Sequence, residues 1–343
     1  MIKSLVTGGA GYFGDLLTRK LLERGDYVRI LDIHRPVANY PGTEVIQGDI
    51  RDPDVVLSAC EGMEIVFHNA AQVAMAKNRE LFWSVNHDGT KNLLEGCLSR
   101  AVKKVVYTSS SAVYGIPKAN PVTEETVPTP VEDYGRAKLA GENLCRAYTV
   151  KGLDVSIVRP CTILGHGRLG IFQILFEWVR EGKNIPVLNH GNNVYQFVHA
   201  ADFADVCIRA SAAKGAEDFN CGTDRFGTMR EVLQHLCRHA DSGAKVRSLP
   251  MWPIVAAMNL SAALGVSPLA SYHASMYGRS LYFDISKARN QLGWVPRFSN
   301  DEMFVESYDW YLANRAAVLA GTDSSQHRSA VNQGVLKLLH WFL

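Results

Sequence analysis

The chain has 343 residues, of which 47% are hydrophobic and 20% are charged, and its formal net charge at neutral pH is +2. This composition is that of an ordinary globular protein, and the length suits one large α/β unit or two lobes. So small a net charge argues against a nucleic-acid partner. The seven cysteines are widely spaced and form no CxxC pair, so we expect a reduced, cytoplasmic compartment, no disulfide framework and no metal site.

The first 32 residues predict a strand, a glycine-rich turn, a helix and a second strand. The first strand ends at Thr7, the turn spans 8–14, and the helix carries its apolar residues at a spacing near 3.6. The second strand ends in an acid, Asp32. In this context the glycines at 8, 11 and 14 are a dinucleotide-binding fingerprint.

Each glycine of the turn has a separate role in such a site. Gly8 allows a tight turn, Gly11 lets the backbone approach the pyrophosphate, and Gly14 lets the helix pack closely on the strand. Asp32 is expected to accept hydrogen bonds from the adenosine ribose, which favours NAD over NADP. Arg35 follows closely and weakens this preference. The competing interpretation of the pattern is a purely structural turn.

Strands and helices are predicted to alternate, which is typical of a doubly wound parallel sheet of the Rossmann type. Strands are expected at 43–49, 64–71, 103–110 and 154–160, and helices at 53–60, 81–100 and 131–150. The small residues Asn69, Ala70 and Ala71 end one buried strand and leave room for a flat cofactor. Asp49 ends another strand and is a candidate partner for the adenine amino group, or alternatively a turn cap.

Beyond Pro160 the pattern becomes less regular, and glycines are frequent from 165 to 170. We therefore expect an NAD-binding Rossmann domain over 1–160, with a sheet that later segments complete, and a mainly substrate-binding lobe over 161–320. Residues 321–343 are expected to form a polar linker and an apolar C-terminal helix. That helix is too short to span a bilayer. It is expected to dock on the protein or a partner, or to make a peripheral membrane contact.

A phenol and an ammonium group, Tyr134 and Lys138, are four residues apart, which places them on one face of a helix. Ser109, Ser110 and Ser111 end a predicted strand, where the crevice of such a sheet lies. Oxidation of a secondary alcohol needs a base, and a nearby cation lowers the pKa of a tyrosine from its usual value of about 10. Ser110 is expected to hydrogen-bond the substrate oxygen. A solvated helix face is the alternative interpretation of the pair.

Together these motifs resemble the extended short-chain dehydrogenase/reductase family, in its NAD-dependent epimerase/dehydratase group, over about residues 1–315. The matching positions are the glycine turn, Asp32, Gly48-Asp49, the run from His68 to Ala71, the run from Ser109 to Gly115, Tyr134, Lys138, Arg159-Pro160 and the run from Leu292 to Pro296. The resemblance implies that Tyr134 is the base, that Lys138 holds the nicotinamide ribose and that Ser110 is the catalytic hydroxyl. It also implies a homodimer formed through helices near 86–100 and 133–150.

The expected NAD site combines the fingerprint with these later motifs. Its members are Gly8, Gly11, Tyr12, Phe13, Gly14, Asp32, Asp49, Ile50, Asn69, Ala70, Ala71, Asn86, Tyr134, Lys138 and Pro160.

The preferred hypothesis is an enzyme similar to nucleotide-sugar epimerases. Ser111-Ala112 stands where the family's sugar 4,6-dehydratases carry an Asp-Glu pair, which argues against water elimination, and residues 113–138 look like 4-epimerases. Two departures weaken the match. Thr162 replaces an asparagine, and Val194 and Tyr195 stand where a phosphate-binding arginine is usual. The arginines that could substitute are Arg168, Arg225 and Arg279. The expected substrate contacts are Ser111, Thr162 and Tyr195.

A second hypothesis is a dehydrogenase of an apolar alcohol. The apolar stretch 250–264 and the run 282–288 resemble the 3β-hydroxysteroid and sterol dehydrogenase branch. That stretch is expected to line an apolar pocket, to rest on a membrane surface, or to be a core or dimer helix. A third hypothesis is a non-catalytic NAD-sensing scaffold, which the presence of both Tyr134 and Lys138 disfavours. The histidines at 68, 166, 190 and 199 lack metal-ligand spacing and are expected to be core or loop residues.

Overall fold

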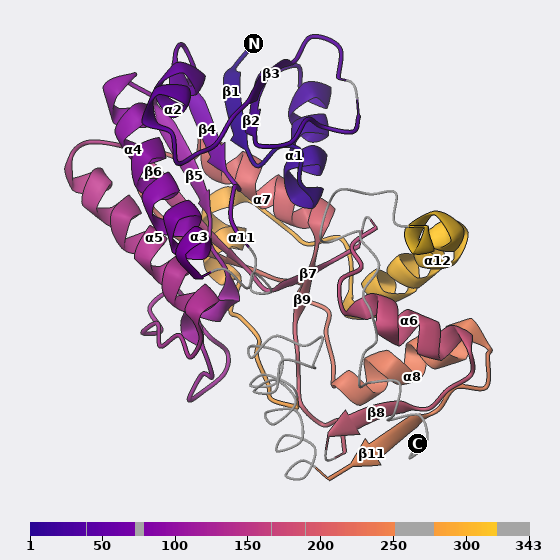
Figure 1. The fold of residues 1–343 in the computed structure, drawn as a ribbon. Coiled ribbons are helices and arrows are strands. Elements are labelled where there is room, and N and C mark those ends of the chain that lie inside the picture. Colours follow the sequence, from indigo (N-terminus) through magenta and orange to yellow (C-terminus); the bar gives the residue numbers. More distant parts are fainter. Residues whose placement is uncertain (39, 73–78, 166, 189, 251–277, 321–343) are drawn as a thin grey trace.

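A computed structural model of the chain (Figure 1) describes residues 1–38, 40–72, 79–165, 167–188, 190–250 and 278–320. Three predictions lie wholly or almost wholly outside these residues. They are the apolar stretch 250–264, of which only Pro250 is described, His166, and the linker and C-terminal helix over 321–343.

The larger part of the molecule is a seven-stranded sheet in the order β10-β6-β5-β4-β1-β2-β3, with every neighbouring pair parallel. The strands are β1 (Lys3–Thr7), β2 (Tyr27–Asp32), β3 (Glu44–Gln47), β4 (Ile65–His68), β5 (Lys104–Thr108), β6 (Val155–Pro160) and β10 (Asp218–Cys221). The chain builds outward from β1 to β3 and then crosses to the other side of β1 to continue with β4. This confirms the predicted doubly wound Rossmann-type sheet, whose crevice opens between the carboxyl ends of β1 and β4.

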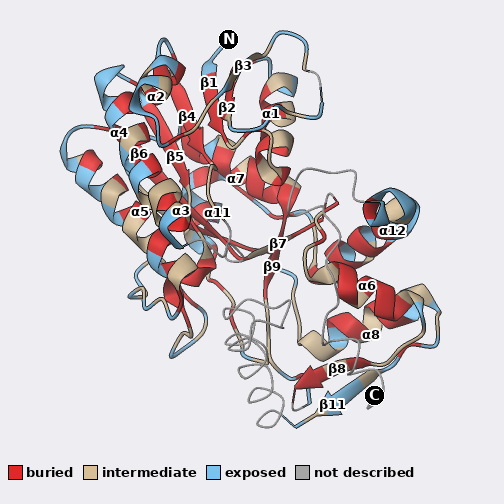
Figure 2. Cartoon of the chain, in the orientation of Figure 1, coloured by how far each residue is buried: buried red, intermediate tan, exposed pale blue. Residues whose placement is uncertain are grey.

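Helices cover both faces of this sheet (Figure 1). One face packs against α1 (Tyr12–Glu23), α7 (Ala200–Ala212) and α11 (Ser286–Leu292), and the other against α2 (Pro53–Cys60), α4 (Thr90–Ser99) and α5 (Asp133–Val150). Neighbouring residues of β5 point to opposite faces, so that Val106 joins the first core and Tyr107 joins the second. Because both faces are covered, the strands other than β3 are largely buried, whereas β3 lies at the edge of the sheet and is partly exposed (Figure 2).

The helical stretch predicted over 81–100 consists of three successive parts. The structure has α3 (Arg79–Trp83), a π-helical turn η1 (Ser84–Gly89) and then α4. Gly89 lies against Ile50, and a Cβ at this glycine would come within 2.6 Å of the Ile50 side chain. Such π-helical turns are frequent at functional sites.

A smaller lobe lies beside the end of the sheet that carries the crevice (Figure 1). It contains two parallel strand pairs, β7 (Thr162–Leu164) with β9 (Phe197–His199) and β8 (Ile185–Leu188) with β11 (Val246–Leu249). Three helices, α6 (Phe172–Arg180), α8 (Met229–Ala240) and α12 (Asn300–Leu319), enclose its own hydrophobic core. Among the described residues, no helix combines the length and the apolar character needed to cross a bilayer.

Candidate active site

The glycine turn lies directly beneath the loop that follows β4. Gly8 has a φ of 71°, and a Cβ there would lie 2.8 Å from the backbone nitrogen of Ala70. At Gly14 a Cβ would lie 2.1 Å from the Gly8 carbonyl oxygen, so helix α1 can approach the turn only with glycine at this position. Gly11 is the N-cap residue of α1 and offers no side-chain cap. The N–H groups of this uncapped first turn are suited to binding a pyrophosphate.

The two aromatic residues of the turn, both predicted to bind NAD, use their side chains for packing. The Tyr12 hydroxyl donates a hydrogen bond to the carbonyl oxygen of Gly165. The Phe13 ring stacks on Phe203 of α7, with 4.2 Å between the ring centroids. Their contribution to a nucleotide site would therefore come from their backbone N–H groups, at the start of α1.

Asp32 lies half-buried at the end of β2, beside the glycine turn. Its two carboxylate oxygens accept hydrogen bonds from the backbone N–H groups of Ala10 (3.0 Å) and His34 (2.9 Å). Arg35 is exposed and donates to the side chain of Gln47 at 3.2 Å. The carboxylate is thus fixed where an adenosine ribose is expected, and the nearby arginine is occupied elsewhere.

On the expected adenine side, Asp49 pairs with a neighbouring arginine. The carboxylate of Asp49 forms a salt bridge with Arg51, whose hydrogen bonds lower the pKa of this aspartate. Asp49 also accepts a hydrogen bond from the Arg51 backbone N–H at 2.9 Å, which is the alternative turn role. Ile50 is buried against Gly89.

The loop after β4 is held from below by threonines and from behind by Asn86. Thr7 accepts hydrogen bonds through its hydroxyl from the N–H groups of Asn69 (3.2 Å) and Ala70 (3.3 Å). The Asn86 amide forms two hydrogen bonds to the backbone of Gln72, at 2.9 and 3.1 Å, and Asn86 is only 3% exposed. The structure therefore places Asn86 behind the loop after β4, residues 69–72, which is called the cofactor loop below. The hydrogen bonds of Asn86 hold the shape of this loop.

His68, at the end of β4, belongs to the same support. Its ring nitrogens lie 2.8 Å from the hydroxyl of Thr7 and 2.9 Å from that of Thr90. Complete burial lowers the pKa of His68 to about 3, with a smaller contribution from the positive charge of Lys138. The imidazole is therefore neutral and structural, and the described residues contain no cluster of potential metal ligands.

Tyr134 is placed by the first turn of α5. The carboxylate of Glu132 caps this helix by accepting hydrogen bonds from the N–H groups of Tyr134 and Gly135, both at 2.7 Å. Gly135 allows a close approach, because a Cβ there would lie 2.4 Å from the carbonyl oxygen of Ala112. The helix is thereby docked on the short 3-10 turn η2 (Ser111–Tyr114) that follows the serines.

Lys138 reaches from α5 to the end of β5. Its ammonium nitrogen donates a hydrogen bond to the carbonyl oxygen of Thr108 at 2.8 Å, and the side chain is almost fully buried. Burial lowers the pKa of Lys138 to about 8. The Thr108 hydroxyl in turn donates to the Asn69 side chain at 2.6 Å, which links the lysine to the cofactor loop.

Only one serine of the run after β5 is accessible. Ser109 and Ser111 are buried at 2% and 4% exposure, whereas Ser110 is partly exposed. The Ser110 hydroxyl accepts a hydrogen bond from the Ala112 N–H at 3.2 Å, which caps the 3-10 turn and leaves the O–H to donate elsewhere.

Sequence reasoning missed a buried ion cluster beneath these groups. Glu142, one turn after Lys138 on α5, accepts hydrogen bonds from Ser109 (2.6 Å) and, at two points, from Arg159 (2.7 Å each). Arg159 also pairs with Asp218 at 2.7 Å. The Arg159-Pro160 motif was the only sign of this cluster in the sequence, and nothing indicated its partners.

The expected substrate side is formed by β7, by Tyr195 two residues before β9, and by the loop after β7. The hydroxyls of Thr162 and Tyr195 lie 3.0 Å apart, which joins two of the predicted contacts. The Arg168 guanidinium lies over the Tyr12 ring, 5.6 Å from its centroid. Burial lowers the pKa of Arg168, and nearby Tyr12 and Tyr134 oppose this effect. The Arg168 guanidinium is thus within electrostatic range of the expected base.

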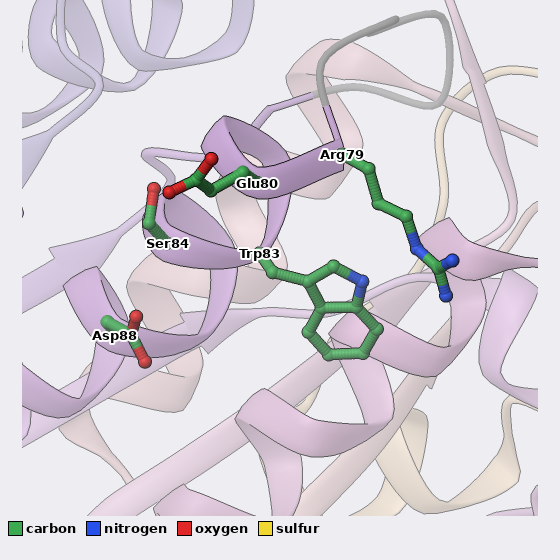
Figure 3. A pocket seen from close by; sticks show the side chains of 5 residues that line it. All are labelled: Arg79, Glu80, Trp83, Ser84 and Asp88. Carbon is green, nitrogen blue, oxygen red and sulfur yellow. The ribbon is translucent and has the colours of Figure 1, made fainter.

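The two other candidate arginines lie elsewhere. Arg225 forms a salt bridge with Glu302 at 3.1 Å, in the first turn of α12, and Arg279 is exposed. A groove of about 640 Å³, shown in Figure 3, also lies apart from the catalytic groups. The residues that line it belong to α3 and η1. They are Arg79, Glu80, Trp83, Ser84 and Asp88.

Comparisons with known proteins agree with this arrangement. The model of the NAD dependent epimerase/dehydratase family matches residues 4–222. The chain is 53% identical to the uncharacterized protein y4nG of Sinorhizobium fredii, over 99% of this chain and 86% of that protein. It is 28% identical to a UDP-glucose 4-epimerase of Mycolicibacterium smegmatis, over 90% of this chain and 98% of that one.

The chain is also similar to steroid dehydrogenases in sequence and to epimerases of known structure in fold. A 3 beta-hydroxysteroid dehydrogenase/Delta 5-->4-isomerase of Mycobacterium tuberculosis is 30% identical, over 90% of each chain. The crystal structure of a UDP-glucose 4-epimerase from Thermotoga maritima superposes with a TM-score of 0.75 at 23% identity, covering 92% of this chain and all of that one. At this identity, the structural similarity supports the fold.

Proposed function

The chain belongs to the NAD-dependent epimerase/dehydratase family, and from this premise we propose that it is a nucleotide-sugar epimerase-like enzyme that oxidises and reduces a secondary alcohol. One observation supports the proposal above all. A line of direct contacts joins the glycine turn to Ala70, Asn69 to Thr108, and Thr108 to Lys138. The cofactor loop and the catalytic lysine are therefore parts of one crevice.

NAD is the family's cofactor, and the residues of this crevice fit it. The glycine turn is a cradle that a Cβ would fill, and the uncapped first turn of α1 is suited to the pyrophosphate. Asp32 would hold the adenosine ribose and Lys138 the nicotinamide ribose. When bound, NAD supplies the acceptor for the hydrogen that leaves the carbinol carbon.

The protein's own groups manage the proton of the substrate hydroxyl. Tyr134, as phenolate, takes this proton, and Ser110 donates a hydrogen bond to the oxygen on which charge develops. Lowering a phenol pKa by about 3 units needs about 4 kcal/mol of differential stabilisation. We propose that the positive charges of Lys138 and Arg168 contribute to this stabilisation.

The charge of Arg168 favours an anionic substrate over an apolar alcohol. The Arg168 guanidinium is half-buried and lies within electrostatic range of Tyr134, and the described residues show no carboxylate within salt-bridge distance of it. Such a group is suited to a phosphate or a carboxylate. Val194 and Tyr195, which stand where the family usually carries a phosphate-binding arginine, have no charge. We propose that Arg168 binds the anion in their place. A nucleotide sugar meets this requirement.

The substrate class is tested with purified protein, NAD and two candidate substrates. Incubation with UDP-glucose should give the 4-epimer while nicotinamide absorbance stays constant, because an epimerase returns the hydrogen in each cycle. Net NADH formation from a 3β-hydroxysteroid would overturn the epimerase proposal and support the second hypothesis, for which the 30% identical relative speaks. Cofactor binding without any turnover would favour the scaffold hypothesis.

The role of Arg168 is tested with Arg168→Met, for which Arg225→Met is the matched control because Arg225 is paired with Glu302. Losing one charge-assisted contact of about 1.5–3 kcal/mol should raise KM for a nucleotide sugar by at least about tenfold. Steady-state kinetics give the comparison. Equal KM values in the two variants would contradict an anion site at Arg168.

We further propose a homodimer formed through α4 and α5. These helices pack side by side on one face of the sheet, and Leu98 of α4 and Val150 of α5 are exposed apolar residues. Light scattering of the purified protein tests this proposal. A monomer at every concentration would contradict it.

A further inference from the structure

The ammonium group of Lys138 lies over an aromatic ring. Its nitrogen is 5.2 Å from the centroid of the Tyr107 ring, and Tyr107 is 2% exposed in the core between the sheet and α5. On the side of the crevice, the same nitrogen donates to the carbonyl oxygen of Thr108. The cation therefore lies between a π face and a carbonyl group.

A glycine makes this arrangement possible. At Gly141 of α5, a Cβ would lie 2.1 Å from the Tyr107 hydroxyl oxygen and 2.7 Å from the ring carbon that bears it. The hydroxyl itself approaches the Lys138 carbonyl oxygen only at 3.5 Å, the limit of a hydrogen bond. The face of the ring, rather than the hydroxyl group, is therefore what Tyr107 offers to the lysine.

The charge on Lys138 is finely balanced. Burial removes water from the ammonium group and lowers its pKa to about 8, close to neutral pH, while Cys145 and Glu142 act in the opposite direction. A ring face attracts a cation, and more strongly when the cation has lost its water. The ring face therefore favours the charged form of Lys138 over the neutral amine.

We propose that Tyr107 is a positioning residue of the active site, whose ring face keeps the ammonium group of Lys138 charged and directed at the cofactor crevice. It acts through Lys138. Neither its buried hydroxyl nor its ring lines the crevice. The proposal depends on the cofactor site alone, so it stands or falls separately from the identity of the substrate.

Several charged or titratable groups surround Lys138, and their effects on the pH dependence have to be distinguished from that of the lysine. His68 of β4 stays neutral, because its pKa is about 3, and burial raises the pKa of Cys145 on α5. Glu142 is held in its double hydrogen bond with Arg159 of β6. The phenol of Tyr134 is removed from the readout by working in a Tyr134→Phe background.

The readout is the affinity for NADH as a function of pH, measured by the fluorescence of the bound nucleotide. Because a charged Lys138 holds the nicotinamide ribose, affinity should fall as pH rises through the lysine pKa, near about 8 in the Tyr134→Phe parent. In Tyr107→Leu the midpoint should move down by about one pH unit, a tenfold change in the ratio of charged to neutral lysine. Tyr107→Phe keeps the ring and should leave the midpoint unchanged.

Two further variants make the test decisive. Gly141→Ala keeps the tyrosine at position 107 but should push its ring away from the lysine. This variant should shift the midpoint in the same direction, even if Tyr107→Leu does not fold. Lys138→Met should abolish the pH dependence. An unchanged midpoint in the folded variants that displace or remove the ring, or a pH dependence that survives Lys138→Met, would overturn the proposal.

Discussion

At the scale of single residues, Ser110 shows how exposure distinguishes neighbours that the sequence cannot. Three serines follow β5, and two of them face inward, with Ser109 bound to Glu142. The resemblance pointed to Ser110 from its distance to Tyr114, and the structure leaves that hydroxyl accessible with its O–H unengaged in the turn cap. Burial of the side chains, which no spacing rule reveals, decides which hydroxyl can meet a substrate.

Tyr134→Phe tests the base directly. The variant keeps the ring and the cap at Glu132 but loses the group that takes the proton, so turnover should fall by about 10²–10⁴-fold. Affinity for NADH, measured by fluorescence, should stay close to that of the wild type. Full turnover in this variant would show that another group is the base.

Asp32→Asn tests the choice of cofactor. The amide keeps an acceptor oxygen for the Ala10 N–H but loses the negative charge that repels a 2′-phosphate. We expect NAD to bind about tenfold or more weakly, because hydrogen bonds to charged groups contribute about 1.5–3 kcal/mol, and NADP to bind relatively better. Calorimetric titration with both nucleotides gives the ratio, and Arg35→Gln is the control for the neighbouring charge. A preference that stays the same would rule out Asp32 as the discriminating group.

At the scale of elements, α5 was expected to begin near Val131 and begins at Asp133, because Glu132 is used as its N-cap. Periodicity predicted the helix, yet the cap depends on a carboxylate that folds back onto two N–H groups. The helical stretch predicted over 81–100 is present, but periodicity did not reveal its π-helical turn. Within that turn, the Asn86 side chain binds the backbone of Gln72, a contact with the loop after β4 rather than along the helix.

Glu132→Ala measures the cap that places Tyr134. The two hydrogen bonds at 2.7 Å would be lost, and the free energy of unfolding should fall by about 1–2 kcal/mol. Urea denaturation followed by circular dichroism gives this value, with Glu125→Ala in the neighbouring loop as a surface control. Turnover should fall more than stability predicts, since the first turn of α5 carries the base. Equal stability of the two variants would contradict the capping role.

At the scale of the whole molecule, the smaller lobe depends on a salt-bridge cluster that connects α6 to α12. Glu177 accepts hydrogen bonds from Tyr311 (2.7 Å) and Arg315 (2.7 and 3.0 Å) of α12 and from Arg180 of its own helix. Burial alone would raise the pKa of Glu177, but hydrogen bonds from Arg315, Arg180 and Tyr311 outweigh it and lower the pKa to about 2. The folded state therefore binds the ionised form more strongly than the unfolded state does.

This lowered pKa predicts a pH dependence of stability. Above the unfolded pKa of about 4.5 the contribution is complete, at most about 3 kcal/mol, and it is lost as pH falls from there toward about 2. Glu177→Gln should destabilise the protein at neutral pH and flatten its stability curve at acidic pH. Denaturant titrations across this range compare the two proteins. Parallel curves would mean that Glu177 does not contribute the acid sensitivity.

The sequence by itself determined the parallel sheet, the glycine turn, the acid Asp32 at the end of the second strand, and the pair of Tyr134 and Lys138. These features depend on local periodicity, on glycines at fixed spacing and on residues one helical turn apart. Only the tertiary structure decided which groups surround them. The ring of Tyr107 against Lys138, the pairing of Glu142 with Arg159 and the position of Arg168 beside Tyr12 join residues far apart in the chain. Such contacts arise from packing between elements, whose outcome depends on the shapes of all the side chains involved and leaves no periodic signal in the sequence.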